Sequence, residues 1–153
     1  MSAVLDLKPV ILVTGILLTT LGAAMLVPAL VDIAAGNPDW QVFAGSSAAT
    51  TLVGISFFAA TRGMSRTLST RQAMLMTVVV WLALVTAGAL PFRWSGITPS
   101  FTDAFFESMS GLTTTGATVI TGLDHAPPGI LLWRGMLQWL GGLGILSQLE
   151  AEA

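Results

Sequence analysis

The sequence predicts an all-α, polytopic membrane protein, and three features support that fold class. Of its 153 residues, 54% are hydrophobic and only 9% are charged, whereas soluble domains usually carry about 25% charged residues. The apolar residues gather in runs of bilayer length, and short loops that hold most of the charges separate these runs. Lipid is therefore the expected surrounding of most of the chain.

The first two apolar runs are expected to form a helical hairpin. They cover residues 9–34 and 41–61, and about 20 residues at 1.5 Å each can cross a ~30 Å hydrocarbon core. Residues 36–39 (GNPD) are typical of a turn, and Trp40 suits the membrane interface. The first run has no small-residue cleavage site, so we expect it to be retained as a helix, kinked near Pro28.

Two further spans are expected at residues 74–90 and 130–146. The first of them should stop at Pro91, because proline cannot donate the next helical hydrogen bond. The second has only about seventeen apolar residues, which is marginal for crossing a bilayer. We expect the chain to divide into a hairpin with its loop, residues 1–70, and a second unit, residues 71–153.

The positive charges of the short loops predict the orientation. Arg62, Arg66 and Arg71 lie between the second and third spans, and Lys8 precedes the first. Cytoplasmic loops of membrane proteins are enriched in such residues. The N-terminus should therefore be cytoplasmic, in a multi-pass protein of the inner (plasma) membrane.

A short helix is expected between the last two spans. Ser100 and Asp103 have the spacing of a helix N-cap, and an apolar stretch follows to residue 112. A helix over residues 101–112 would be about 18 Å long. It is too short to span a bilayer and too apolar to lie in water, so a re-entrant helix is the expected arrangement.

The segment after this helix, residues 113–118 (TTTGAT), is the strongest candidate for a functional site. Non-helical backbone within a membrane must be buried in protein or line a water-filled cavity. A helix C-terminus directs partial negative charge and free carbonyls toward such a cavity, which favours a cation. Successive carbonyls of Thr114, Thr115 and Gly116 can replace the hydration shell of an ion, and Gly116 can adopt the angles that aim them.

Charged residues near this segment allow more than one interpretation. Glu107 either hydrogen-bonds the rear of the loop or acts on a cation directly. Arg134 either extends toward the membrane surface or pairs with Glu107 or Asp124. His125 has no second histidine and no cysteine with which to share a metal ion, so a solvated loop residue is expected.

An enzyme and a nucleic-acid-binding protein are both disfavoured. The sequence has no Gly-x-Ser-x-Gly, His-Glu-x-x-His or phosphate-binding lysine motif, so no catalytic residue and no bound cofactor are predicted. The six basic residues are scattered and the formal net charge is -2. No nucleic-acid partner is therefore expected.

Four motifs carry a resemblance to a known family. They are ALPF at 89–92, TDAFFESMSGLTTTGAT at 102–118, GLD at 122–124 and LLWRGMLQWLGGLGI at 131–145. With the hairpin before them, the chain resembles the N-terminal part of the potassium-translocating subunit of the Trk/Ktr/HKT superfamily. The resemblance implies four helix, pore-helix, helix units around a central potassium pore, and a cytoplasmic nucleotide-binding subunit as regulator.

By the same resemblance, the segment 113–118 is the selectivity-filter loop of the first unit. Gly116 corresponds to the filter glycine, and Thr113, Thr114, Thr115 and Ala117 are its neighbours. Potassium would be the transported ion, held by backbone carbonyls.

The chain departs from the family pattern because it contains one unit and ends in SQLEAEA. One loop cannot surround an ion, so further units are expected from a longer chain or from copies of this chain. A fragment or truncated product is the favoured interpretation. The alternative is a truncated membrane protein that packs with partner helices in the lipid and conducts nothing alone.

Overall fold

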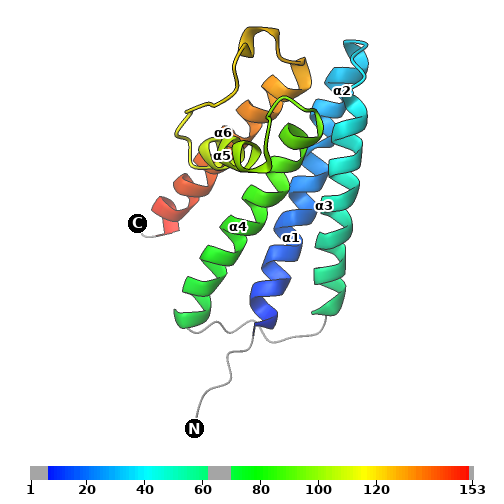
Figure 1. Ribbon diagram of the computed structural model, residues 1–153. Helices are drawn as coiled ribbons and strands as arrows, with labels where there is room; N and C mark the ends of the chain where they lie inside the picture. Colours follow the sequence, from blue (N-terminus) through cyan, green and yellow to red (C-terminus); the bar gives the residue numbers. More distant parts are fainter. Residues whose placement is uncertain (1–6, 62–69, 152–153) are drawn as a thin grey trace.

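The computed structural model of the chain describes residues 7–61 and 70–151. Its elements are α1 (Lys8–Ala24), α2 (Leu26–Ala34), α3 (Trp40–Ala60), α4 (Thr70–Trp94), α5 (Phe101–Leu112), a 3-10 turn (Leu123–His125) and α6 (Pro128–Ala151). The helices α1, α3 and α4 run side by side, and α5 and α6 lie against the far end of α4 (Figure 1). The described residues contain no strand, which confirms the all-α class.

The first expected span is divided into two helices. The break falls at Met25, three residues before Pro28, and together α1 and α2 form a 27-residue apolar stretch. Because proline has no N–H, a regular helix loses one hydrogen bond in the turn before it, which favours a bend there. The bend allows α1 to pack on α3 and α4, whereas α2 packs on α3 and α6.

Glycines allow α1 and α3 to approach closely. A Cβ atom at Gly15 would lie 2.8 Å from the carbonyl oxygen of Gly54, closer than side chains can pack. The hydroxyl of Ser47 donates a 2.7 Å hydrogen bond to the carbonyl oxygen of Gly22 on the facing helix. Small residues therefore hold the hairpin together, as is usual for membrane helices.

Helix α4 corrects one expectation from the sequence. We expected it to stop at Pro91, but the helix continues through Pro91 to Trp94. Proline removes only its own donor, and its carbonyl still accepts a 3.1 Å bond from the N–H of Ser95. Loss of a single donor therefore does not end the helix.

Helix α5 has the predicted bounds, 101–112, and the predicted cap. The Ser100 hydroxyl accepts a 3.1 Å bond from the N–H of Asp103 and donates to its carboxylate at 2.7 Å. This arrangement satisfies one of the N–H groups that every helix start leaves unpaired.

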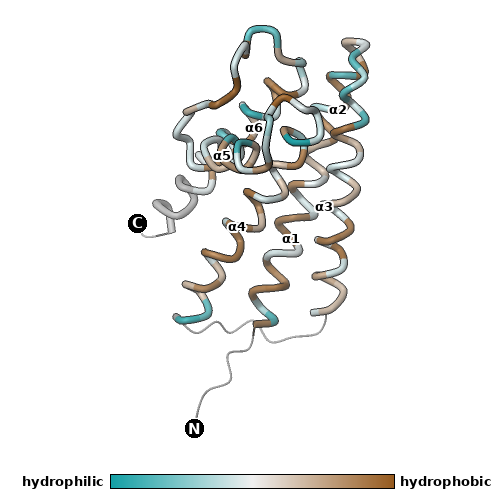
Figure 2. Tube along the Cα trace, in the orientation of Figure 1, coloured by the Kyte–Doolittle hydropathy of each residue, from teal (hydrophilic) through white to brown (hydrophobic). Residues whose placement is uncertain are grey.

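Three helical stretches among the described residues are long and apolar enough to cross a membrane: Lys8–Ala34, Trp40–Ala60 and Arg71–Trp94. Figure 2 shows their apolar character over most of their length. Helix α6 is not among these three stretches of the described residues. A fourth span at 130–146 therefore stays a prediction.

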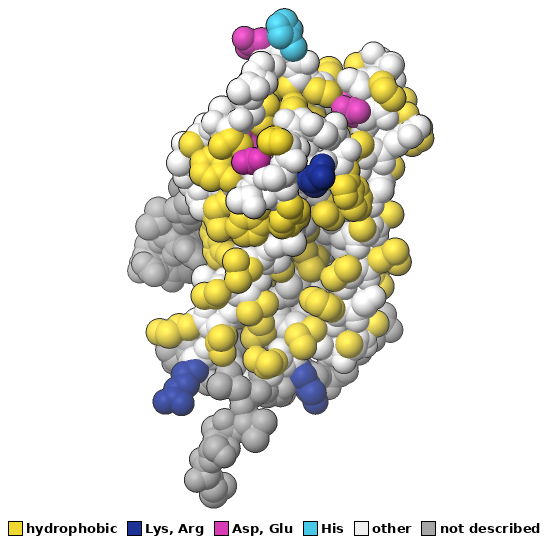
Figure 3. All heavy atoms as spheres, viewed as in Figure 1, with side chains coloured by type: hydrophobic (Ala, Val, Ile, Leu, Met, Phe, Trp, Pro, Cys, Tyr) yellow, Lys and Arg dark blue, Asp and Glu magenta, His cyan; other side chains and the backbone are white. Residues whose placement is uncertain are grey.

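Charge is distributed unevenly along the molecule. The starts of α1 and α4, with Lys8 and Arg71, lie together at one end (Figure 1). Acidic side chains and the histidine lie toward the other end, beyond an apolar band (Figure 3). Arg62 and Arg66, which also entered the predicted orientation, lie outside the described residues.

The apolar core takes buried side chains from all six α-helices of the described residues, and its largest rings lie where α3 meets α6. Phe43 and Trp133 are fully buried there and stack edge to face, with ring centroids 6.3 Å apart. The indole N–H of Trp133 donates a 3.0 Å bond to the carbonyl oxygen of Gly88, so the ring's one polar group is satisfied. This core joins the hairpin to the second unit.

The span assignment of α4 yields a direct test. Val79 is an exposed residue of the apolar part of α4. Its replacement by lysine should sharply reduce the membrane-inserted fraction, because a charge near a helix centre costs about 2.5–3.5 kcal/mol in insertion. Quantitative immunoblotting of carbonate-washed membranes measures that fraction. Val79→Leu is the control, and normal insertion of Val79→Lys would contradict the span.

Candidate ion-coordinating loop

Three glycines fix the position of α5 between its neighbours. A Cβ atom at Gly88 would overlap the hydroxyl of Ser108, and one at Gly141 would overlap the carbonyl of Leu112. A Cβ atom at Gly111 would approach the side chain of Leu137 to 2.9 Å. The last turn of α5 is therefore held closely between α4 and α6.

The end of α5 is a Schellman motif with an unusual residue in it. The N–H of Thr114 bonds to the carbonyl oxygen of Gly111 at 2.9 Å, and that of Thr115 bonds to Ser110 at 3.0 Å. This pattern requires a left-handed residue, and Thr114 has φ of +57°. A β-branched residue rarely adopts that conformation, which costs about 1–2 kcal/mol. Such strain is common at functional sites.

The same motif leaves a row of carbonyl groups free. The N–H groups of Thr114, Thr115 and Gly116 turn back toward the end of α5. Within the part of the chain that the structure describes, the carbonyl oxygens of residues 113–116 accept no hydrogen bond. Gly116 has φ of +76°, and the whole segment 113–118 is exposed. These oxygens are available to replace the water around a cation.

Ala117 differs from its neighbours. Its carbonyl oxygen accepts a 2.7 Å hydrogen bond from the hydroxyl of Ser110. Thr113 also differs, because its hydroxyl bonds both to the Met109 carbonyl at 2.8 Å and to the hydroxyl of Thr115. Within the described residues, the carbonyl oxygens of Thr113, Thr114, Thr115 and Gly116 are therefore free, whereas that of Ala117 is occupied.

The rear of the loop is held by one buried carboxylate. Oε1 of Glu107 accepts bonds from the hydroxyl of Thr118 at 2.6 Å, from the N–H of Val119 at 2.6 Å and from the N–H of Ile120 at 3.3 Å. Hydrogen bonds to a charged group are stronger than neutral ones. Glu107 thus ties the irregular segment after Gly116 to the middle of α5.

Arg134 neutralises this carboxylate. Its Nε donates to Oε2 of Glu107 at 3.0 Å, with side-chain exposures of 13% for the arginine and 0% for the glutamate. The sequence allowed Glu107 or Asp124 as the partner of Arg134, and in the structure Arg134 pairs with Glu107. The pair joins α6 to α5 and, through Glu107, to the loop.

Other titratable groups lie outside this arrangement. Asp124 and His125 are exposed in the 3-10 turn, and Asp103 is the cap partner of Ser100. No cluster of three potential metal ligands occurs within the described ranges. Asp124 and His125 therefore take no part in the hydrogen bonds that hold the loop.

Three residues within the motifs noted above were given no role of their own in the sequence analysis. Ser110 and Thr118 fasten the loop through their hydroxyls, as described above. The amide nitrogen of Gln138 lies 3.9 Å from where a Cβ atom of Gly116 would be. The two hydroxyl contacts cannot be assigned from the sequence alone, because they form only when the loop folds back on α5.

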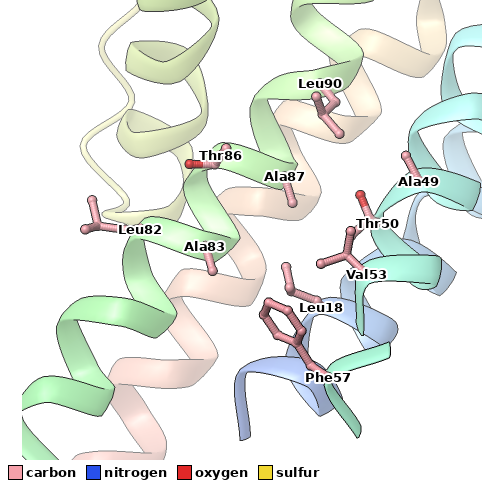
Figure 4. Close-up of a pocket in the computed structure, with 10 residues that line it drawn as sticks. All are labelled: Leu18, Ala49, Thr50, Val53, Phe57, Leu82, Ala83, Thr86, Ala87 and Leu90. Carbon is pink, nitrogen blue, oxygen red and sulfur yellow. The ribbon is translucent and has the colours of Figure 1, made fainter. Parts of the chain in front are cut away.

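A groove of about 390 Å³ opens elsewhere, between α1, α3 and α4 (Figure 4). Its lining is almost wholly apolar, with Thr50 and Thr86 as the polar residues and no charged side chain. This apolar lining does not suit a cation. The loop after α5 remains the candidate site.

The chain is similar to known proteins of one family. The TrkH family, described as cation transport protein, matches residues 39–148. A Trk system potassium uptake protein, TrkH, from Halomonas elongata is 39% identical over 143 residues, covering 93% of this chain and 30% of the relative. The Escherichia coli K12 protein of that name is 38% identical over 135 residues, with 88% and 28% covered.

A solved structure agrees in fold. The potassium transporter TrkH from Vibrio parahaemolyticus matches with a TM-score of 0.87 and 39% identity, over 92% of this chain and 30% of that one. The chain therefore spans about 30% of the length of these relatives.

The apolar helical bundle, with a short capped helix and an irregular loop after it, defines a polytopic α-helical membrane protein. The family match covers most of the chain, and proteins that share the name TrkH match by sequence and by structure. The chain belongs to the TrkH cation transport protein family.

The ion pair behind the loop can be tested by removing one partner. Arg134→Met should lower the free energy of unfolding by about 3–5 kcal/mol, because it leaves a buried carboxylate without a counter-charge. Glu107→Gln in the same chain should recover part of the loss, since both charges are then gone. Thermal unfolding in detergent measures this, and additive effects of the two substitutions would contradict the pairing.

The strained threonine gives a second test. Thr114→Gly should raise the free energy of unfolding by about 1 kcal/mol, because glycine adopts positive φ without a Cβ clash. Thr113→Gly, at an ordinary φ of -83°, is the matched control and should be destabilising. Chemical denaturation in a single detergent compares them. A loss of stability in Thr114→Gly would argue against a left-handed Thr114.

Proposed function

We propose that this chain supplies the first pore unit of a potassium transporter and that its loop coordinates the ion. The observation that carries the proposal is the row of unbonded carbonyl oxygens at Thr114, Thr115 and Gly116, exposed at the C-terminal end of α5. The negative end of the helix dipole at that point also favours a cation. Two matched relatives are named potassium uptake proteins, which supports potassium as the ion.

Ion passage would follow from the balance between dehydration and binding. Potassium loses water at the mouth, is held briefly by carbonyls, and leaves because binding at each position is weak. One loop offers oxygens from one side only. The remaining sides would come from further units of a longer chain or from additional copies of this one, surrounded by lipid.

The orientation and regulation are also part of the proposal. Lys8 and Arg71 lie at one end of the bundle, which we assign to the cytoplasm of the inner (plasma) membrane, with the N-terminus there. A cytoplasmic nucleotide-binding subunit would control flux, as the family resemblance implies. The chain itself would act as neither enzyme nor cofactor-binding protein.

A chimeric transporter provides the functional test. The chain would replace the segment that it matches in the Halomonas elongata relative, expressed in cells that lack potassium uptake. Gly116→Asp should abolish uptake or its preference for potassium over sodium, because a side chain at φ of +76° displaces the carbonyls and adds a charge. Rubidium and sodium uptake are measured together with membrane protein levels.

Gly122→Asp is the matched control for this experiment. Gly122 also has positive φ, +73°, but it lies in the exposed turn beyond the loop, and nothing lies within 4 Å of where its Cβ atom would be. Selective uptake by Gly122→Asp and its loss in Gly116→Asp support the filter assignment. Unchanged selective uptake by a well-expressed Gly116→Asp chimera would overturn it and would favour a chain that only packs with partner helices.

A further inference from the structure

Asp32 is a buried acid that the ion-coordinating loop does not use directly. It lies on α2 with 0% exposure, 97 residues before its partner, the N–H of Gly129. Its Oδ1 accepts a 2.8 Å hydrogen bond from that N–H, in the first turn of α6. An acid within an apolar span is costly, and such residues usually have a specific partner.

The contact joins the hairpin to the second unit at a fixed place. A helix leaves its first four N–H groups without partners inside the helix, and a carboxylate there also meets the positive end of the helix dipole. Asp32 therefore caps α6 from another helix. The backbone of Asp32 is itself held, because its carbonyl oxygen accepts a 2.8 Å bond from the N–H of Asn37 in the turn after α2.

The fit around Asp32 is close. A Cβ atom at Gly129 would overlap Oδ2 of Asp32, so glycine is required for the carboxylate to approach the helix end. Oδ2 has no hydrogen-bond partner within the described residues. The negative charge of Asp32 also contributes, after burial, to raising the pKa of Asp39 at the start of α3.

The capped helix leads directly to the loop. Arg134 follows Gly129 by five residues on α6 and pairs with Glu107, and Glu107 holds Thr118 and Val119 at the rear of the loop. A shift of the first turns of α6 would move Arg134 and disturb that carboxylate. Polar contacts therefore connect α2 to α6, and α6 through Glu107 to the irregular segment that follows Gly116.

We propose that Asp32 is a positioning residue for ion selectivity, acting through the N-terminus of α6 and the Arg134–Glu107 pair. The inference rests on the proposed potassium-conducting function of the loop. It assigns the N-terminal hairpin a role in conduction: it sets the geometry of the filter loop rather than serving only to anchor the chain in the membrane.

The test uses the same chimera and two readouts. Asp32→Ala should raise the rubidium concentration for half-maximal uptake about tenfold and lower the preference for rubidium over sodium by a similar factor. Loss of one charged hydrogen bond has an effect of this size. Asp32→Asn should recover most of this effect, because its amide oxygen still accepts from Gly129. Amide hydrogen exchange of residues 129–131 reports the cap independently of transport, and it should become faster only in the alanine variant.

A glycine pair on α6 supplies the steric control. Gly129→Ala should reproduce the Asp32→Ala effect by pushing the carboxylate away. Gly135→Ala should leave uptake and exchange unchanged, since nothing lies within 4 Å of where its Cβ atom would be. Both variants add the same methyl group to the same helix.

The outcomes separate this inference from the proposed function. Faster exchange in Asp32→Ala with unchanged selectivity would mean that the cap exists but does not reach the loop, and would overturn the inference. Unchanged hydrogen exchange in Asp32→Ala would also overturn the inference, because Asp32 would then not stabilise the N-terminus of α6. A different result would overturn the proposed function itself: normal ion selectivity in the Gly116→Asp chimera.

Discussion

The buried carboxylate of Glu107 is the interaction on which the loop depends. Its two oxygens receive donors from two directions, the irregular segment after Gly116 on one side and Arg134 of α6 on the other. A carboxylate with 0% side-chain exposure is stable only when it is both paired and hydrogen-bonded. Because the loop's N–H groups are committed to α5 and to this carboxylate, the carbonyls of Thr114 to Gly116 are left free.

The rest of the fold brings these groups to one place. Glycines at the crossings of α5 with α4 and α6 remove the side chains that would hold the helices apart. Packing between the hairpin and the second unit, including Phe43 against Trp133, fixes the helices around the loop. A bilayer supplies little hydrophobic force between helices, so close packing and polar contacts of this kind must supply the association.

Much of this could be predicted from local sequence. The apolar runs, the turn at 36–39 and the cap at Ser100 depend on neighbouring residues, and the structure has α5 at the predicted bounds. The stop at Pro91 was wrong because the hydrogen bonds after proline outweighed the one it lost. The contact of Asp32 with Gly129 was not predicted, since 97 residues separate them and no local pattern records the contact.

The central claim is that backbone carbonyls of one short segment hold the permeant ion. Anomalous X-ray scattering from rubidium, in crystals of a full-length transporter that contains this chain, locates the ion without relying on flux. The account predicts a rubidium peak in front of the carbonyl oxygens of Thr114, Thr115 and Gly116, with Glu107 buried behind them. A peak coordinated by the carboxylate of Glu107, or none near this loop, would contradict it.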